Sequence, residues 1–192
     1  MNVYLCGPIE KEVDGGKGIR DKIKRAFKSH ENINFIDPCE FEYNSEFKSV
    51  KEIKKNKPKI WKDIVKTMIK GDLDGVKNSD IVLTILNKNA SVGSYSEMVF
   101  AAYNNVPVVI YLEDSTQSEK LHPWIQTAAW FISNEIEEIE KTIVAFCLAF
   151  MKKETDEVIK CQKNHQENPI TIMKQKHQIK KNTLNLSTKN VL

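Results

Sequence analysis

The sequence lacks the spacing patterns by which metal sites and disulfide frameworks are recognised. It has four cysteines and four histidines in 192 residues, with no CxxC pair, no HExxH motif and no Cys/His set with the spacing of a metal site. We therefore expect neither a metal ion nor another cofactor. Cys6 lies in an apolar stretch typical of a strand and Cys147 in one typical of a helix, so both are predicted to be small core residues.

The sequence also has little net charge and no long hydrophobic run. Its formal charge is +3, and its lysines are scattered and mostly close to Glu or Asp, which does not favour binding to a nucleic-acid polymer. The apolar stretches are too short to span a bilayer, and the first residues do not have the pattern of a signal peptide. We expect a cytoplasmic protein in a reducing compartment, without a membrane partner.

What the sequence does contain is a regular alternation of apolar strands and amphipathic helices. Two runs are apolar on both faces, which is typical of central parallel strands. With three shorter runs they predict five strands, at 2–6, 34–36, 81–86, 106–112 and 130–132. Helices are predicted at 19–29, from 58 onward, at 94–105 and at 135–153. This alternation predicts an α/β fold, a flavodoxin-like doubly wound five-stranded parallel sheet with helices on both faces.

The domain organisation follows from composition. Residues 1–153 are predicted to form the α/β domain, and 154–192 a polar C-terminal extension, partly disordered, because that stretch is rich in Lys, Asn, Gln and Thr. Doubly wound sheets bind ligands outside the carboxyl ends of their strands. The candidate site loops are therefore 7–18, 37–43, 87–97 and 113–124, and the aperiodic stretch 39–57 is predicted to cover the substrate.

The most informative loop runs from Asn87 to Glu97, between a buried strand and a helix. Gly93 is predicted to permit a tight turn there, and a helix N-terminus offers backbone N–H groups to an anion. Hydroxyl donors come from Ser91, Ser94 and Ser96. Glu97 is expected in the first turn of the helix, where it would either reach the same crevice or form a capping box with Ser94.

Asp72 is the second carboxylate of interest, just before the strand at 81–86. A lone Asp at this place is typically a helix cap or a surface charge. If Asp72 and Glu97 converge on one crevice, however, they can divide nucleophile and acid–base roles at an acetal-like carbon. Asp80, immediately before the strand, is predicted to be structural.

Three segments together resemble the nucleoside 2-deoxyribosyltransferase superfamily, which includes transferases and 2'-deoxynucleoside 5'-phosphate N-hydrolases. They are Tyr4-Leu-Cys-Gly-Pro-Ile9, Asp72-Leu-Asp-Gly-Val-Lys-Asn-Ser-Asp80 and Ser91-Val-Gly-Ser-Tyr-Ser-Glu97, in this order within residues 1–143. The resemblance implies that Glu97 is a nucleophile that forms a glycosyl-enzyme. It further implies that Asp72 orients the sugar or base and assists proton transfer to the leaving base.

The resemblance also implies which residues bind the substrate. The turn Gly7-Pro8-Ile9 would lie against base or sugar, beside Tyr4, although the phosphohydrolase branch often has Ser where this chain has Pro8. Transferases commonly have Asp six residues before the nucleophile, whereas this chain has Ser91, as in the phosphohydrolases, where it helps to hold a 5'-phosphate. Gly93 and Ser94 belong to the same predicted binding loop. His122 matches a phosphate-binding Ser of a neighbouring subunit, or it simply begins a helix before Pro123.

Several readings stay open at this point. The first is an N-glycosidase acting on a (deoxy)nucleoside 5'-monophosphate, and the nearest alternative is a nucleoside 2-deoxyribosyltransferase. More distant alternatives are a TIR-like NAD glycohydrolase and a non-catalytic nucleotide-binding module. The resemblance implies a small-molecule substrate and a homodimer, for which the apolar helix face at 60–68 would be the contact unless it packs on the sheet. Lys17 and Arg20 are either phosphate partners or ordinary solvated charges.

Overall fold

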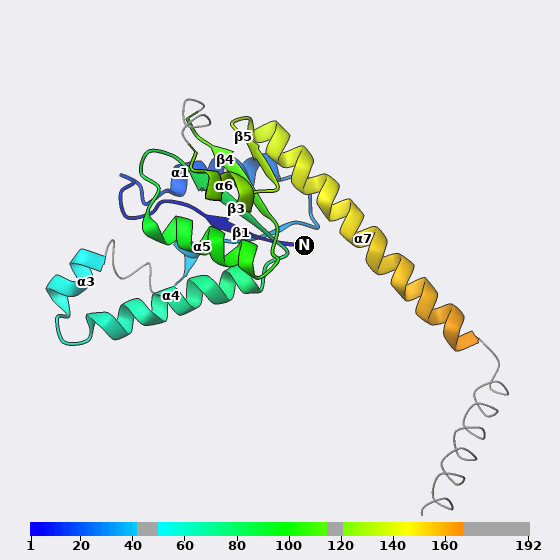
Figure 1. Cartoon of the computed structure of the whole chain (residues 1–192), viewed down its shortest axis with the longest axis horizontal. Coiled ribbons are helices and arrows are strands. Elements are labelled where there is room, and N and C mark those ends of the chain that lie inside the picture. The colour runs from blue at the N-terminus through cyan, green and yellow to red at the C-terminus, as the bar shows by residue number, and fades with distance from the viewer. Residues whose placement is uncertain (42–49, 115–120, 167–192) are drawn as a thin grey trace, which may run out of the picture. The chain divides into compact units, whose positions relative to one another are not determined.

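A five-stranded parallel sheet with the order β2-β1-β3-β4-β5 forms the centre of the protein (Figure 1). The structure is a computed structural model, and it describes residues 1–41, 50–114 and 121–166. The strands are β1 (Asn2–Cys6), β2 (Asn34–Ile36), β3 (Ile81–Leu86), β4 (Val108–Leu112) and β5 (Phe131–Ser133). All four neighbouring pairs are parallel, so the predicted flavodoxin-like α/β fold is confirmed.

Helices connect the strands. They are α1 (Lys17–Ala26), the 3-10 turn η1 (Pro38–Glu40), α3 (Val50–Asn56), α4 (Trp61–Lys77), α5 (Val92–Tyr103), α6 (Pro123–Ala128) and α7 (Ile136–Gln166). The sequence predicted α1, α4, α5 and α7, with α7 ending earlier. It predicted no helix at α3 or α6, because both are short and have no long apolar periodicity.

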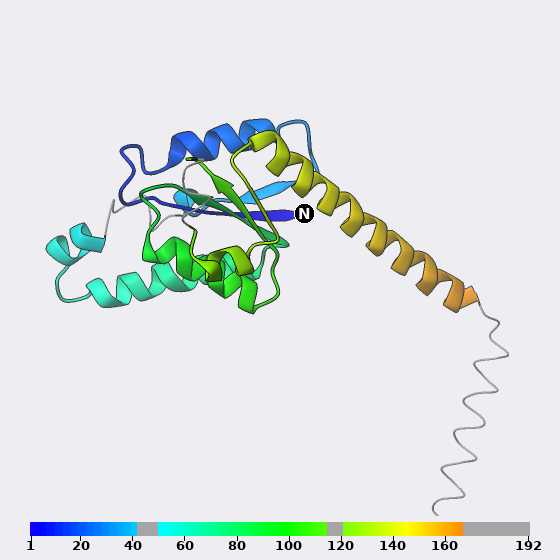
Figure 2. The same ribbon diagram turned by 45° about the horizontal axis from the view of Figure 1, so that its top comes forward.

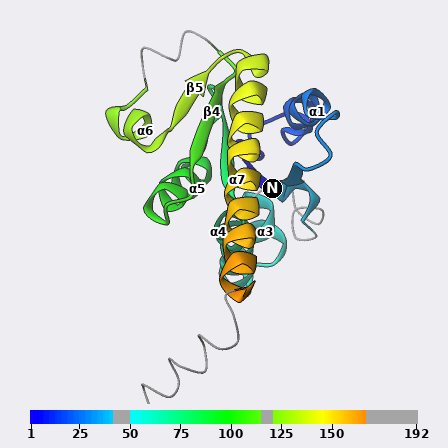
Figure 3. The ribbon, with the colours of Figure 1, turned by 90° about the vertical axis from the view of Figure 1, so that its right-hand side faces the viewer.

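Alternate residues of the strands pack into two separate cores, one on each face of the sheet. Val3 and Leu5 of β1 belong to a core closed by α1 and the first turns of α7, whereas Tyr4 and Cys6 belong to a core closed by α4, α5 and α6. Figures 2 and 3 show these two layers of helices on opposite sides of the strands. Because β3 is buried along its whole length, it is the central strand that its sequence predicted.

The start of α5 differs from the prediction in a way that matters for the site. The helix begins at Val92, two residues earlier than expected, with Ser91 in an extended conformation before it. Gly93 is therefore helical, and the tight turn predicted for it is wrong. The glycines that have positive φ are Gly15 and Gly16, in the loop before α1, where the left-handed conformation does require glycine.

The chain divides into two units, Met1–Cys147 and Leu148–Leu192. The first contains the sheet, and α7 continues in the second as far as Gln166. The predicted domain boundary after residue 153 stays a prediction. Parts of the predicted covering loop (42–49), of the loop 113–124 (115–120) and of the extension (167–192) lie outside the described residues. Among the residues described, no helix combines the length and apolarity needed to cross a membrane.

Candidate active site

Glu97 lies where the carboxyl end of β1 meets the beginning of α5. The side chains of Tyr4 and Cys6, both fully buried on the α5 side of the sheet, lie close enough to its carboxylate to lower its pKa. A Cβ atom placed on Gly93 would be 3.9 Å from Glu97 Oε1 and 3.5 Å from Ser91 Oγ, so the carboxylate and the Ser91 hydroxyl flank this glycine. Glu97 itself is only partly exposed. The structure therefore brings three predicted site residues, Tyr4, Ser91 and Gly93, close to the Glu97 carboxylate.

The electrostatic environment of Glu97 keeps it close to its titration point at neutral pH. Burial and, second, the negative charge of Asp72 raise the pKa of Glu97 to about 7, although Cys6, Tyr4 and the charge of Arg20 oppose the rise. A carboxylate that is both partly desolvated and close to another carboxylate is typical of catalytic acid–base or nucleophilic groups. Asp72 therefore lies near enough to Glu97 to raise its pKa, and the convergence of the two on one crevice stays a prediction.

The capping-box interpretation of Glu97 is wrong. The residue before the helix is Ser91, which makes no side-chain capping bond, and the first turn contains no acidic residue. Glu97 is the sixth residue of α5, in its second turn, too far along to reach the first backbone N–H groups. Ser94 is 2% exposed, with its Oγ 3.5 Å from Ser91 Oγ. The burial of Glu97 therefore does not follow from helix capping.

Asp72 is held in place by the close approach of α4 to the sheet. It lies inside α4, five residues before the last residue of that helix, so it is not a cap. One turn further on, a Cβ atom on Gly75 would be only 2.7 Å from Cε2 of Tyr4. The absence of a side chain at Gly75 lets α4 pack directly on the Tyr4 ring, and this contact holds the α4 segment that carries Asp72. Asp80 accepts a hydrogen bond from the Asn2 N–H at 2.7 Å, a structural role as predicted.

Arg20 shapes the turn that was predicted to bind base or sugar. Its guanidinium is 0% exposed and donates to the carbonyl oxygens of Gly7 (3.1 Å), Pro8 (3.2 Å) and Gly16 (3.1 Å). Its Nε lies 3.2 Å from Oδ1 of buried Asp37. Both interpretations of Arg20, phosphate partner and solvated charge, are therefore wrong, because the side chain is buried and occupied by the protein itself. Lys17 is exposed at the start of α1.

The turn Gly7-Pro8-Ile9 follows β1 directly. A Cβ atom on Gly7 would be 3.0 Å from Cβ and 3.3 Å from the carbonyl oxygen of Ile85, so only glycine fits without a shift of β3. Pro8 is buried and Ile9 partly exposed. The turn leaves the sheet at the end of β1, directly after Cys6, and so begins close to Tyr4 and Glu97.

His122 lies at the beginning of α6. It is exposed and precedes α6, where its Nδ1 accepts a hydrogen bond from the Trp124 N–H at 3.3 Å. This confirms that His122 begins a helix before Pro123. Its predicted contact with phosphate stays a prediction.

A polar network that the sequence did not predict joins three of the site loops. Asn87 Nδ2 donates to Glu12 (2.9 Å) and to Glu113 (2.8 Å), and Asn89 Nδ2 donates to Glu12 at 3.0 Å. The loops after β1, β3 and β4 are thereby tied together at the carboxyl edge of the sheet. Nothing in their spacing identifies these residues, because Glu12, the pair Asn87 and Asn89, and Glu113 belong to three different loops. Within residues 1–41, 50–114 and 121–166 no three His, Cys, Asp or Glu side chains are grouped so as to hold a metal ion.

The chain resembles known proteins in its fold only. No protein-family model and no curated protein matches the chain. A 2-deoxyribosyltransferase from the psychrotolerant bacterium Bacillus psychrosaccharolyticus has a TM-score of 0.53 and 16% identity, covering 73% of this chain and 90% of its own. A conserved protein from Enterococcus faecalis V583 has the same score and identity, covering 73% of this chain and 95% of its own. The chain thus has the same fold as these two proteins.

Proposed function

We propose that the protein is an N-glycosidase that cleaves the base–sugar bond of a (deoxy)nucleoside 5'-monophosphate, with Glu97 as the nucleophile. The observation that carries this proposal is the Glu97 carboxylate itself, partly buried at the carboxyl edge of the sheet, with its pKa raised to about 7 by burial and by the charge of Asp72. The likeness in fold to a 2-deoxyribosyltransferase supports it, as do the three sequence segments that meet around this carboxylate.

In the first step the ionised Glu97 attacks the anomeric carbon. The bond between that carbon and the base nitrogen breaks, its electron pair goes to the base, and Asp72 in its protonated form gives its proton to the leaving base and is left ionised. The transition state has oxocarbenium character, which the negative charge of Glu97 stabilises. The turn Gly7-Pro8-Ile9, held by Arg20, would lie against base or sugar.

In the second step a water molecule attacks the same carbon and displaces Glu97. Asp72 accepts the proton of the water, the ester bond to Glu97 breaks, and the sugar phosphate leaves with its anomeric configuration retained. If a second free base replaced the water, the same intermediate would give a new nucleoside. The deoxyribosyltransferase alternative thus differs from the proposal only in the acceptor.

The 5'-phosphate would bind at the start of α5. Ser91 makes no side-chain capping bond there, so its hydroxyl, the neighbouring Ser94 hydroxyl and the first backbone N–H groups, that of Gly93 included, form a set of donors. A carboxylate at position 91 would repel the phosphate, whereas a hydroxyl donates to it. Ser91 is the feature that favours monophosphates over nucleosides.

Replacing Ser91 with Asp should therefore reverse the substrate preference. With a panel of nucleosides and their 5'-monophosphates, chromatography of the released base should show wild-type activity mainly on monophosphates. For Ser91→Asp, kcat/KM for monophosphates should fall about 100-fold or more, because two negative charges would meet at the site, while the value for nucleosides changes little. Ser29→Asp, which adds an exposed charge outside α5, is the matched control.

The same panel separates the alternatives. A new nucleoside formed on addition of a second base would indicate a transferase, and nicotinamide released from NAD would indicate the TIR-like activity. Ligand binding without release from any substrate would favour a non-catalytic module and contradict the proposal.

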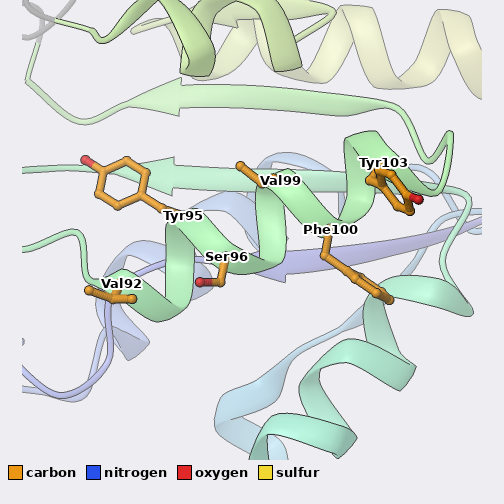
Figure 4. Close-up of a pocket in the computed structure, with 6 residues that line it drawn as sticks. All are labelled: Val92, Tyr95, Ser96, Val99, Phe100 and Tyr103. Carbon is orange, nitrogen blue, oxygen red and sulfur yellow. The ribbon is translucent and has the colours of Figure 1, made fainter.

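We further propose that the protein acts as a homodimer through α5. Figure 4 shows a groove of about 560 Å³ along one side of this helix, lined by Val92, Tyr95, Ser96, Val99, Phe100 and Tyr103. None of these residues is charged, although 29% of the chain is, so two copies can meet across a two-fold axis without repulsion. In such a dimer His122 would reach the phosphate bound by the other copy.

Light scattering should accordingly give about twice the chain mass of 22.1 kDa. Val99→Glu should shift the protein to the monomer, because a charge would be buried in the contact. Ile60→Glu, on the helix face first considered for the dimer, should leave the mass unchanged. A wild-type monomer that is active at low concentration would exclude the shared site.

A further inference from the structure

The Asn87 side chain joins three loops at the carboxyl edge of the sheet. It directly follows β3, and its Nδ2 donates to Glu12 (2.9 Å) in the loop after β1 and to Glu113 (2.8 Å) after β4. Its Oδ1 accepts a hydrogen bond from the Asn89 N–H at 2.8 Å. Because ionised carboxylates only accept hydrogen bonds, the nitrogen of the amide and not its oxygen faces the two glutamates. The donor hydrogens and the oxygen of this amide are therefore all used.

The chemistry of this contact restricts the residue type at position 87. Two carboxylates repel each other unless a donor lies between them, and Asn supplies two donor hydrogens on one nitrogen without a charge. Asn89 Nδ2 adds one more donor to Glu12, at 3.0 Å. An Asp at position 87 would bring a third carboxylate to the same place, and a Leu would have nearly the shape of Asn but no donor.

The loop that contains Glu12, residues 7–16, also contains the turn proposed to contact base or sugar. Arg20 donates to carbonyl oxygens at both ends of this loop. In its middle the Glu12 N–H donates to the carbonyl oxygen of Ile9 at 3.2 Å, so the backbone of Glu12 is bonded directly to the turn. The side chain of Glu12 then connects the turn to Asn87.

The loop that begins at Asn87 leads to the proposed phosphate site. The Ala90 N–H donates to the Asn87 carbonyl oxygen at 3.1 Å, and Ser91 follows immediately, before the first residue of α5. Asn87 therefore connects the part of the site proposed to contact base or sugar with the part proposed to bind phosphate. A substrate that contacts both parts at once requires a fixed distance between them.

We propose that Asn87 is a positioning residue that fixes the turn Gly7-Pro8-Ile9 relative to Ser91 and so sets the distance over which a nucleoside monophosphate binds. The inference rests on the proposed function, because it concerns the same site and the same substrate. Asn87 acts through the two loops rather than by contact with the substrate. Its loss should weaken substrate binding more than it slows the chemical step, because Glu97 lies on α5 and outside both loops.

The loop 7–16 can be followed without any substrate, by hydrogen–deuterium exchange with mass spectrometry. Asn87→Asp places a third carboxylate between the two glutamates, so the amides of residues 7–16 should exchange about 10-fold faster or more than in wild type. Adding Glu12→Gln and Glu113→Gln to Asn87→Asp interchanges the donors and acceptors, and this triple variant should exchange within about 3-fold of wild type. Asn32→Asp, the same substitution at an exposed position before β2, should leave these amides unchanged.

Activity supplies the second readout. For release of base from monophosphates, KM should rise about 10-fold or more in Asn87→Asp while kcat falls less than about 3-fold, and the triple variant should recover most of the KM. Asn87→Leu removes the donors without adding a charge, so a rise of roughly 3-fold or more in its KM would separate loss of the hydrogen bonds from repulsion of the phosphate. Asn32→Asp should have wild-type kinetics.

The positioning role would be overturned by wild-type exchange of residues 7–16 in Asn87→Leu, or by a triple variant that recovers neither exchange nor KM. A fall in kcat with KM unchanged would also contradict it. If Asn87→Asp does not fold, Asn87→Leu and the triple variant carry the same comparison. If the wild type releases no base at all, the proposed function fails, whereas the exchange rates still report on the connection between the loops. The two failures are therefore distinguishable.

Discussion

Glu97→Gln is expected to abolish base release, with kcat lowered about 10⁴-fold or more. The amide has nearly the shape of the carboxylate, but it cannot form the ester intermediate and it provides no negative charge opposite the oxocarbenium ion. The neighbouring side chains of Tyr4 and Cys6 would still have one acceptor oxygen beside them. The loss should therefore be one of chemistry rather than of folding. Initial rates on the preferred monophosphate, with enzyme in large excess for the variant, measure it.

The same substitution, although it abolishes activity, is expected to leave the protein as stable as wild type or more stable at pH 8. The pKa of Glu97 is raised in the folded state, from 4.5 to about 7. Between these values the unfolded chain has already released the proton that the folded chain retains, so stability falls as pH rises through this window. Gln carries no charge to bury, and Glu97→Gln should melt at the same or a higher temperature than wild type at pH 8. The exposed Glu31→Gln should change neither activity nor melting. A variant of Glu97 that is folded and fully active would contradict the nucleophile assignment.

The sequence predicted the fold well because its central strands carry an unambiguous pattern. Both faces of β3 and β4 are covered by helices, so their residues are apolar without alternation, and such runs have few other interpretations. The short helices α3 and α6 have no such pattern. Their conformation depends on neighbours that a local window does not contain.

Part of the candidate site could be read from residue types, whereas the contacts made by buried groups could not. The sequence identified Glu97 and Asp72 as the carboxylates of interest, and in the structure the charge of Asp72 raises the pKa of Glu97. Cys6 was predicted to be a core residue, which its burial confirms, but its hydrogen bond to the Ser94 carbonyl was not predicted. Arg20 lies at a helical position where the sequence cannot distinguish a solvated guanidinium from a buried one, because the partners that bury it are backbone carbonyls. Every residue has a backbone carbonyl, so the sequence does not indicate which carbonyls accept a hydrogen bond from a given side chain.

Arg20→Met is expected to destabilise the protein by about 3–5 kcal/mol, the usual cost of removing one partner of a buried ion pair. Asp37, which is 5% exposed, would keep the Lys24 ammonium, 2.7 Å from its Oδ2, and the Cys39 N–H, 3.0 Å from its Oδ1, but would lose the guanidinium charge. Three carbonyl oxygens of the loop after β1 would lose their donors at the same time. Arg20→Lys should recover only part of the loss, since an ammonium cannot reach Asp37 and three separate carbonyls together. Urea unfolding followed by circular dichroism measures both variants.

Arg25→Met is the matched control, because Arg25 lies on the same helix but is exposed, and it should cost less than about 0.5 kcal/mol. Adding Asp37→Asn to Arg20→Met should cost much less than Asp37→Asn alone, as expected for two partners of one interaction. Equal stabilities of Arg20→Met and Arg25→Met would show that the buried network of Arg20 contributes little to stability.

If instead the network of Arg20 is as important as its burial indicates, the turn Gly7-Pro8-Ile9 loses its support in Arg20→Met. Base release should then fall even under conditions where the variant is fully folded, and KM should rise, because the turn that would contact base or sugar is no longer fixed.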